Sequence, residues 1–591
     1  MRRFEERNFV IAMNRFRHLL AVLLATALIA TACGGGEASD NADAGAGTED
    51  APADSSDSSD TEAAGVDESA DGSDAVTADD VDEVVSGGTL RIGLQTEADS
   101  LNPTNTGINA GPRIILTAVL DTLVVIDTEG QWQNNLSESW TPSDDFLTWD
   151  MTLREGITFS DGEIMNADAV VRTAEAFFAD PLVSLVFRPA FNAENPVEKI
   201  DDLTVRFTAS SPNAHLPSFF AEQVGMVGSP AWLDARDADP SLDQMPIGAG
   251  PYRIVERTQD QVTVLERNEN YWNPDQAGIV DRIELFTDQA GADTQRAETM
   301  LAGELDITHH TDGESVLRLR EAGDSITRIE DQSGEEFVFL MNAQVAPFDD
   351  IRVREAATLA FPRAEYAEFI TQGTTLEADS LFSPDTVWHV PDLVQVNDQP
   401  DLAAPLIEAY CADVPDQCTD GRVNIEYQHD VSDSLDEIAV VVSNAWSEFF
   451  NIELDVIPND QHIQQVTLGL YNTATWRYHG FADPDIDSIF LSCSTIGALS
   501  VNFARNCNEE RDALFEQQRA ITDFDERYDV WVEIQENLRD SFQYITATHT
   551  NWTIGAGANV GGLCDATSPE GVVLPCQEKG IYRLPQLFLT N

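Results

Sequence analysis

The stretch FLTWDMTLREGITFSDG, residues 146–162, decides the fold of this chain. Apolar and polar side chains alternate over its first half, which predicts a strand with one buried face. The Asp-Gly pair at its end predicts a turn, and Asn166 predicts the N-cap of a helix that continues through Phe178. The stretch therefore predicts a strand, a turn and a helix in succession.

Further landmarks lie on both sides of this stretch. Before it come Gly-Gly-Thr-Leu-Arg-Ile-Gly at 87–93, Leu-Asn-Pro at 101–103 and Leu-Asp-Thr-Leu-Val at 120–124. After it come the segments 247–252, 266–272, 301–307, 337–342 and 346–357, the triplet Asp483-Pro484-Asp485, and a helical pattern over 508–542. In this order the landmarks resemble the family 5 extracytoplasmic solute-binding proteins, the peptide, opine and nickel binders of ABC importers.

The resemblance implies an α/β fold with two lobes and a ligand cleft between them, the periplasmic-binding-protein-like fold of class II, cluster C type. We expect lobe 1 to span 87–312, with 546–591 returning to it, and lobe 2 to span 313–545. The implied function is a binding protein of an ABC importer, which captures a small solute by hinge closure and delivers it to the permease. We expect a monomer that is not an enzyme and needs no cofactor.

A short peptide or an amino-acid derivative is the ligand that the resemblance favours. Three other ligands on the same fold stay open, namely an oligosaccharide, an opine and a nickel complex. A hydrolase or a chaperone of exported chains stays open as a function of another class. No His-Glu-x-x-His, Gly-x-Ser-x-Gly or phosphate-binding Gly-rich motif occurs in the sequence, so no catalytic residue is expected.

The N-terminal region, 1–32, has the pattern of a lipoprotein export signal. Basic residues precede an apolar run over 19–30, which at about a dozen residues is too short to span a bilayer that needs about 20. Small residues lead to Cys33, which we expect to carry lipid and to anchor the protein on the outer or periplasmic face of the cell membrane. An ordinary secretory signal stays open, and so does the start codon, Met1 or Met13.

Composition restricts the partners of the chain. Segment 33–86 is rich in Ala, Asp, Ser and Gly without aromatic residues, which predicts a disordered acidic linker. The formal net charge of the whole chain is -71. The electrostatic field of so many negative charges repels nucleic acids and anionic lipid headgroups. We therefore expect no nucleic acid as a partner, and contact with the membrane only through the lipid.

Six further cysteines form three pairs that are close in sequence. In an exported protein such pairs predict disulfides, each closing a short loop. A zinc site is a weak alternative, because no two of these cysteines have the spacing of a zinc ribbon. The expected pairs are Cys411 with Cys418, Cys493 with Cys507, and Cys564 with Cys576.

The resemblance implies that two segments reach the ligand cleft, the loop 106–110 and the segment before Asp483-Pro484. Aromatic rings stack on organic solutes and an arginine binds a carboxylate, so both kinds of residue are binding candidates. The alternative is that Trp476 and Tyr478 belong to the core. The candidate residues in these segments are Ile108, Asn109, Trp476, Arg477, Tyr478, His479 and Asp483.

Gly480 is a departure from the peptide-binding members, which carry an Asp at this place for the α-amino group of the peptide. Arg477 and His479 suit an anionic or carboxylated ligand, and Trp476 suits a sugar. Trp388 and His389 form a second aromatic candidate, with a structural role as the alternative. His309 and His310 lie near Asp306 and Asp312, but adjacent residues point to opposite faces of a strand. We expect a loop near the hinge there and no metal.

Overall fold

The computed structural model describes residues 84–85, 87–97, 99–106, 109–181, 183–287 and 293–590. The expected signal peptide and Cys33 lie outside the described residues, as do Ile108 and nearly all of the expected linker. No helix within the described ranges has both the length and the apolar character that crossing a membrane requires.

The first of the large sheets has seven strands and is built around β2 (Thr89–Gly93), whose Leu90 and Ile92 are fully buried. β2 runs parallel to β11 and β12 on its two sides, and the outer strands are antiparallel to their neighbours. The order is β13 (Ile326–Asp331), β20 (Trp552–Gly557), β12 (Ile307–His310), β2, β11 (Arg282–Phe286), β10 (Val262–Arg267) and β9 (Tyr252–Thr258).

The stretch that opens the sequence analysis lies in a four-stranded antiparallel sheet. Its strand, β6 (Thr148–Leu153), alternates between half-buried and buried residues, which confirms the expected pattern. Asn166 caps α3 (Ala167–Ala179) by accepting a hydrogen bond from Ala169 N, which confirms the expected helix start. The sheet order is β5 (Ser137–Pro142), β6, β8 (Thr204–Thr208) and β7 (Val197–Lys199).

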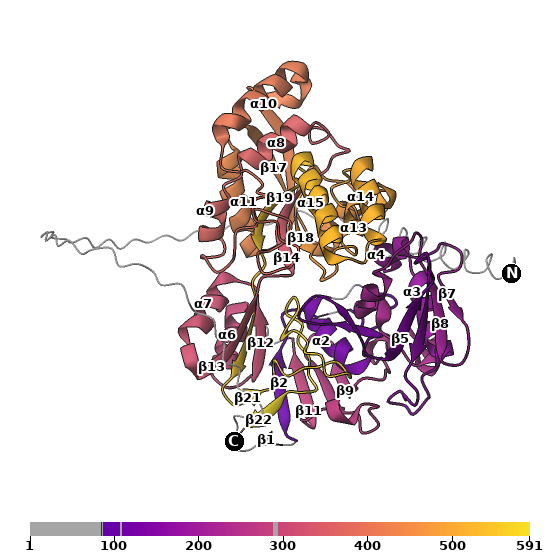
Figure 1. Cartoon of the computed structure of the whole chain (residues 1–591). Helices are drawn as coiled ribbons and strands as arrows, with labels where there is room; N and C mark the ends of the chain where they lie inside the picture. The colour runs from indigo at the N-terminus through magenta and orange to yellow at the C-terminus, as the bar shows by residue number, and fades with distance from the viewer. Residues whose placement is uncertain are drawn as a thin grey trace, which may run out of the picture. The chain divides into compact units, whose positions relative to one another are not determined.

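A third sheet has six strands, and helices of the second half of the chain accompany it (Figure 1). Its order is β15 (Cys418–Thr419), β16 (Arg422–Asp430), β18 (Thr473–His479), β14 (Glu335–Met341) and β19 (Tyr544–His549), with β17 (Phe450–Ile457) paired to β16. The helices are α8 (Ile351–Leu359), α9 (Arg363–Phe369), α10 (Pro400–Asp413), α11 (Asp433–Trp446), α12 (Asn459–Leu468), α13 (Ser488–Leu491), α14 (Glu509–Arg519) and α15 (Phe524–Ser541).

The remaining elements are short or lie on the seven-stranded side. They are β1 (Val84–Val85), α2 (Ala110–Val119), β3 (Val124–Ile126), β4 (Trp132–Asn134), α4 (Ser184–Phe187), α5 (Pro230–Ala238), α6 (Asp293–Leu301), α7 (Gly313–Glu321), β21 (Val560–Gly561) and β22 (Phe588–Thr590). β22 pairs with both β1 and β21, so a strand near the C-terminus meets the start of the described chain.

The chain passes twice between the seven-stranded and six-stranded sheets. It leaves through 332–334, between β13 and β14, and returns through 550–551, between β19 and β20. The first passage comes later than the boundary expected at 312/313, because β13 pairs along its whole length with β20 and so stays in the seven-stranded sheet. Residues next to these two passages lie close to both sheets.

Each expected cysteine pair lies at disulfide distance, with Cα atoms 5.7, 4.6 and 4.2 Å apart for Cys411–Cys418, Cys493–Cys507 and Cys564–Cys576. We predict that peptide mapping without reductant recovers these three pairs. In the loop-entropy model, loops of this length stabilise the fold by about 2–3 kcal/mol each. Free thiols or crossed pairs in the map would contradict the prediction.

Candidate functional site

Arg477 on β18 reaches from the six-stranded sheet to residues of the seven-stranded sheet. Its Nη2 donates to Thr311 Oγ1, which directly follows β12, at 3.3 Å. Its guanidinium lies 5.9 Å from the centroid of the Trp552 ring, and its Nη1 is 3.8 Å from Glu335 Oε2. The side chain is 41% exposed, so the guanidinium keeps donors that face solvent. Such a group suits an anionic ligand.

The loop after β2 meets Arg477 through Thr311. Gln95 Nε2 donates to Thr311 Oγ1 at 3.0 Å, and Thr96 Oγ1 donates to Asn109 Oδ1 at 2.8 Å. The Asn109 side chain is exposed and makes no capping bond to α2, although the residue stands at the N-cap. Asn109 and Arg477 are therefore linked through intervening residues, Thr96 and Gln95 on one side and Thr311 on the other.

The two candidate tryptophans lie in apolar packing. Trp476 packs against the rings of Phe503 and His462, at centroid distances of 4.7 and 5.7 Å. Trp388 is only 4% exposed, packs against Trp531, and donates from Nε1 to Ala482 O at 3.3 Å. These contacts favour the core alternative for both residues, because a ring that is already covered has little face left for a ligand.

His389, next to Trp388, is tied to the backbone of its surroundings. Its Nδ1 lies 3.0 Å from Phe382 O, and its carbonyl oxygen accepts from the Tyr528 hydroxyl at 2.7 Å. Tyr478 and His479 lie on β18, in register with Glu336 and Glu335 of β14, and their side chains lie outside the described part of the structure.

Asp483 forms a buried ion pair with Arg527. Its two oxygens accept from the guanidinium of Arg527 at 2.7 and 3.0 Å, and Oδ1 also accepts from Asp485 N at 2.9 Å. Burial alone would raise the pKa of Asp483, but the charges of Arg527 and His215 and these hydrogen bonds hold it below its ordinary value. A carboxylate paired in this way has a structural role.

A group of buried charged residues beside Arg477 escaped the sequence analysis. Lys579 is 7% exposed, and its Nζ lies 4.0 Å from the centroid of the Phe481 ring. Asp487 accepts from Phe481 N at 3.1 Å, and Glu336 on β14 is 2% exposed. The one signal in the sequence that could have pointed to this group is the rarity of lysine, since Lys579 is one of only two lysines in the chain.

A comparison with known families shows which family the chain belongs to. Residues 131–495, more than half of the chain, match the family model described as bacterial extracellular solute-binding proteins, family 5 (middle). The chain belongs to this family. Its name describes extracytoplasmic proteins that bind solutes, as the sequence landmarks indicate.

Curated relatives of this family 5 protein include peptide binders. The glutathione-binding protein GsiB of Escherichia coli K12 is 28% identical over 260 residues, which are 44% of this chain and 49% of GsiB. That match spans about half the length of the relative. Di/tripeptide-binding protein 3 of Pseudomonas aeruginosa is 23% identical over 445 residues, 70% of this chain and 80% of the relative.

Solved structures confirm the expected fold class, an α/β two-lobe fold of the periplasmic-binding-protein type. DppA of Helicobacter pylori, in complex with the peptide STSA, has a TM-score of 0.72 at 18% identity and covers 86% of this chain and 99% of its own. NikA of Brucella suis, in complex with Fe(III)-EDTA, has a TM-score of 0.68 at 20% identity, over 85% and 100%. At these identities the likeness concerns the fold alone.

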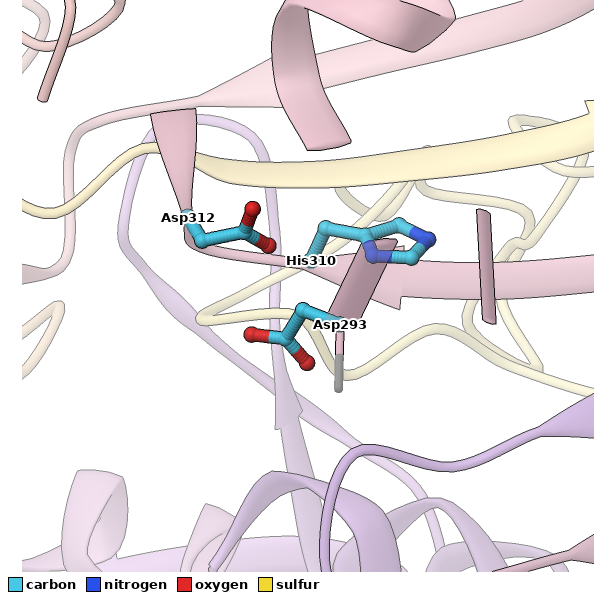
Figure 2. Close-up of side chains that lie close together, drawn as sticks. All are labelled: Asp293, His310 and Asp312. Atoms are coloured by element: carbon cyan, nitrogen blue, oxygen red, sulfur yellow. The ribbon is translucent and has the colours of Figure 1, made fainter. Parts of the chain in front are cut away.

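Asp293, His310 and Asp312 of the family 5 protein come close enough to suggest a metal site (Figure 2). The Arg296 guanidinium pairs with Asp293, donates to His309 O at 2.9 Å and lies 3.5 Å from His310 Nδ1. Arg296 compensates the charge of Asp293, and its positive charge beside the His310 ring opposes the binding of a cation there.

His309 and His310 belong to β12 and are buried, so the expectation of a loop at this place is wrong. Their backbone pairs with Ile554 and Thr553 of β20, which makes them part of the seven-stranded sheet. His309 Nε2 accepts from Gln95 N at 2.9 Å, and Nδ1 is left to donate to Gly580 O at 3.1 Å. These two bonds require the neutral ring.

We predict that His309 makes the protein less stable as the pH falls below about 6.5. Burial, followed by the charge of Arg296, lowers its pKa to about 3. Below pH 6.5 the unfolded chain therefore binds a proton at this histidine, whereas the folded chain does not. The free energy of unfolding falls by about 1.4 kcal/mol per pH unit between pH 6.5 and about pH 3.

Urea unfolding at several pH values between 7 and 4 measures this loss. His309→Gln keeps a donor and an acceptor but takes up no proton in this range, so its free energy of unfolding should depend less steeply on pH than that of the wild type. Parallel curves for the two proteins would contradict the prediction.

Proposed function

We propose that this protein is a lipid-anchored, extracytoplasmic substrate-binding protein of an ABC importer. It captures a small solute between its lobes by hinge closure and delivers the solute to the permease. Membership in family 5 supports the binding role. The observation that carries the proposal is Arg477, a partly exposed guanidinium that contacts both sheets next to the two chain passages.

Lobe 1 in this proposal contains the seven-stranded and four-stranded sheets, and lobe 2 contains the six-stranded sheet. The passages at 332–334 and 550–551 form the hinge, because they are the segments that join the two large sheets. Hinges of this kind concentrate a large change of backbone angles in few residues. Ligand bound between the lobes would hold the contact between Arg477 and Thr311 in place, and so stabilise the closed form.

The proposed ligand is a short peptide or an amino-acid derivative with a carboxylate that Arg477 holds. The relatives named above bind glutathione or di- and tripeptides, and all of these carry carboxylates. Native mass spectrometry of freshly purified protein tests the proposal, since a retained solute is seen as a mass difference. A solute without any acidic group would argue against this ligand class.

Arg477→Ala is expected to weaken binding of the retained solute about 10-fold to 100-fold. A hydrogen bond to a charged group contributes about 1.5–3 kcal/mol, and the partial exposure of Arg477 excludes a larger loss. Isothermal titration calorimetry measures the change. Arg253→Ala is the matched control, because Arg253 is an exposed arginine whose partner is Glu266. Equal losses in both variants would remove Arg477 from the site.

A further inference from the structure

Lys579 stands at the tip of a tight hairpin formed by residues 578–581. Glu578 and Ile581 exchange two backbone hydrogen bonds of 2.9 Å. Lys579 and Gly580 both have positive φ angles, 52° and 75°, as a two-residue hairpin turn of this kind requires. The other lysine of the chain, Lys199, is instead at the surface, where it pairs with Asp168.

The hairpin is fixed to the seven-stranded sheet. Gln577 Nε2 donates to Trp552 O at 2.8 Å and to Ile329 O at 3.2 Å, and Gly580 O lies 3.1 Å from His309 Nδ1. Gly580 packs so closely against the Trp552 ring that a Cβ there would overlap it. The position of the tip is therefore set by the sheet, and the Lys579 side chain extends from a rigid base.

The Lys579 side chain crosses from this base toward the six-stranded sheet. Its stem lies on Gly334 in the first chain passage, where a Cβ would come within 2.5 Å of Lys579 Cγ. Its ammonium ends 4.0 Å from the centroid of the Phe481 ring, just beyond β18. A buried ammonium is costly unless carboxylates and ring faces compensate it.

Three buried carboxyl groups, which come from both sides, are close enough to respond to the charge of the ammonium. Asp487 accepts from Phe481 N, and Glu578 precedes the lysine in the hairpin. Glu336 is buried, and its Oε2 has no hydrogen-bond partner among the described residues. Burial raises the pKa of each of these three acids, and the charge of Lys579 acts against that rise in all of them. The surroundings are those of a receptor for an ammonium group.

This corner adjoins Arg477, the proposed anion contact. The Lys579 stem lies on Gly334, whose carbonyl oxygen packs against Gly480, three residues after Arg477 on the chain. The Trp552 ring touches Gly580 on the hairpin, and the Arg477 guanidinium lies 5.9 Å from the same ring. A ligand held by Arg477 would therefore extend toward the place that the lysine fills.

We infer that Lys579 is a specificity-determining residue whose ammonium occupies the cation-accepting corner beside Phe481 and Asp487, so that the solute this protein selects is an organic anion without a free amino group. The inference rests on the proposed function, and it narrows the ligand class from peptides in general to N-blocked or amine-free acids. A free amino group is excluded because the Lys579 ammonium already occupies the place over the Phe481 ring and next to Asp487.

Two probes that differ only in the amino group test the inference, namely alanyl-alanine and N-acetyl-alanyl-alanine. Calorimetry on the full chain should give the wild type at least a tenfold preference for the acetylated probe. In Lys579→Ala the acids lose their internal cation. The variant should therefore bind the free dipeptide at least ten times more tightly than the wild type does.

Lys579→Met removes the charge but keeps the stem over Gly334, so it carries the test if the alanine variant does not fold. Lys199→Ala is the control and should change neither affinity. No gain for the free dipeptide in either Lys579 variant would overturn the inference, and so would a wild type that prefers the free dipeptide. A wild type that binds both probes equally well would overturn the inference and leave the proposed function standing, whereas a wild type and variants that bind neither probe would count against the proposed function itself.

Discussion

Asp483→Ala should lower the free energy of unfolding by about 3–5 kcal/mol, because it leaves the Arg527 charge buried without its partner. Both side chains are almost fully covered, at 9% and 5% exposure, so water cannot take over the lost bonds. Chemical denaturation followed by circular dichroism measures the loss. An effect of this size is a large part of the stability of an ordinary domain.

A double variant separates the buried charge from the lost packing. Asp483→Ala with Arg527→Leu removes both charges, and it should recover part of the stability that the single variant loses. Asp202→Ala is the control, since Asp202 is highly exposed beside Lys199 and should change stability by less than about 1 kcal/mol. A single variant as stable as this control would show that Asp483 has another role.

Cys33→Ser is expected to release the protein completely from the membrane fraction. The apolar run over 19–30 and the small residues before Cys33 predict lipid on this cysteine, and two or three acyl chains on one residue anchor stably. Fractionation of cells, together with the mass of the N-terminal peptide, measures the change. Cys411→Ser, which removes a thiol of the folded region, should remain in the membrane fraction. A Cys33→Ser protein that stays there with an unchanged N-terminal mass would contradict the lipid anchor.

Local patterns predicted the elements of the fold well. Alternation predicted β6, and the Asn166 cap predicted the start of α3, because both depend on residues close in sequence. The place where the chain leaves the seven-stranded sheet could not be predicted in this way. β13 belongs to that sheet through its pairing with β20, more than 200 residues away, and a local pattern carries no information about such a partner.

The candidate site was predictable only in part, for the same reason. Arg477 became a candidate because it precedes a recognisable landmark, and in the structure it contacts Thr311, next to the seven-stranded sheet. Asp483 looked equally available for ligand binding. Its partner Arg527 lies 44 residues later in the chain, so the sequence does not show that the carboxylate is already paired. Lys579 was missed because only the folded hairpin brings it to Phe481.

Gly480 has a consequence for how this binding site can evolve. A Cβ at this position would overlap the carbonyl oxygen of Gly334, so the backbones of β18 and the first chain passage touch there. A mutation to aspartate would therefore clash before it could offer a carboxylate. Any side chain at position 480 needs Gly334 to move first. Selection acting on one substitution at a time meets a barrier here, so we expect glycine to persist at this position.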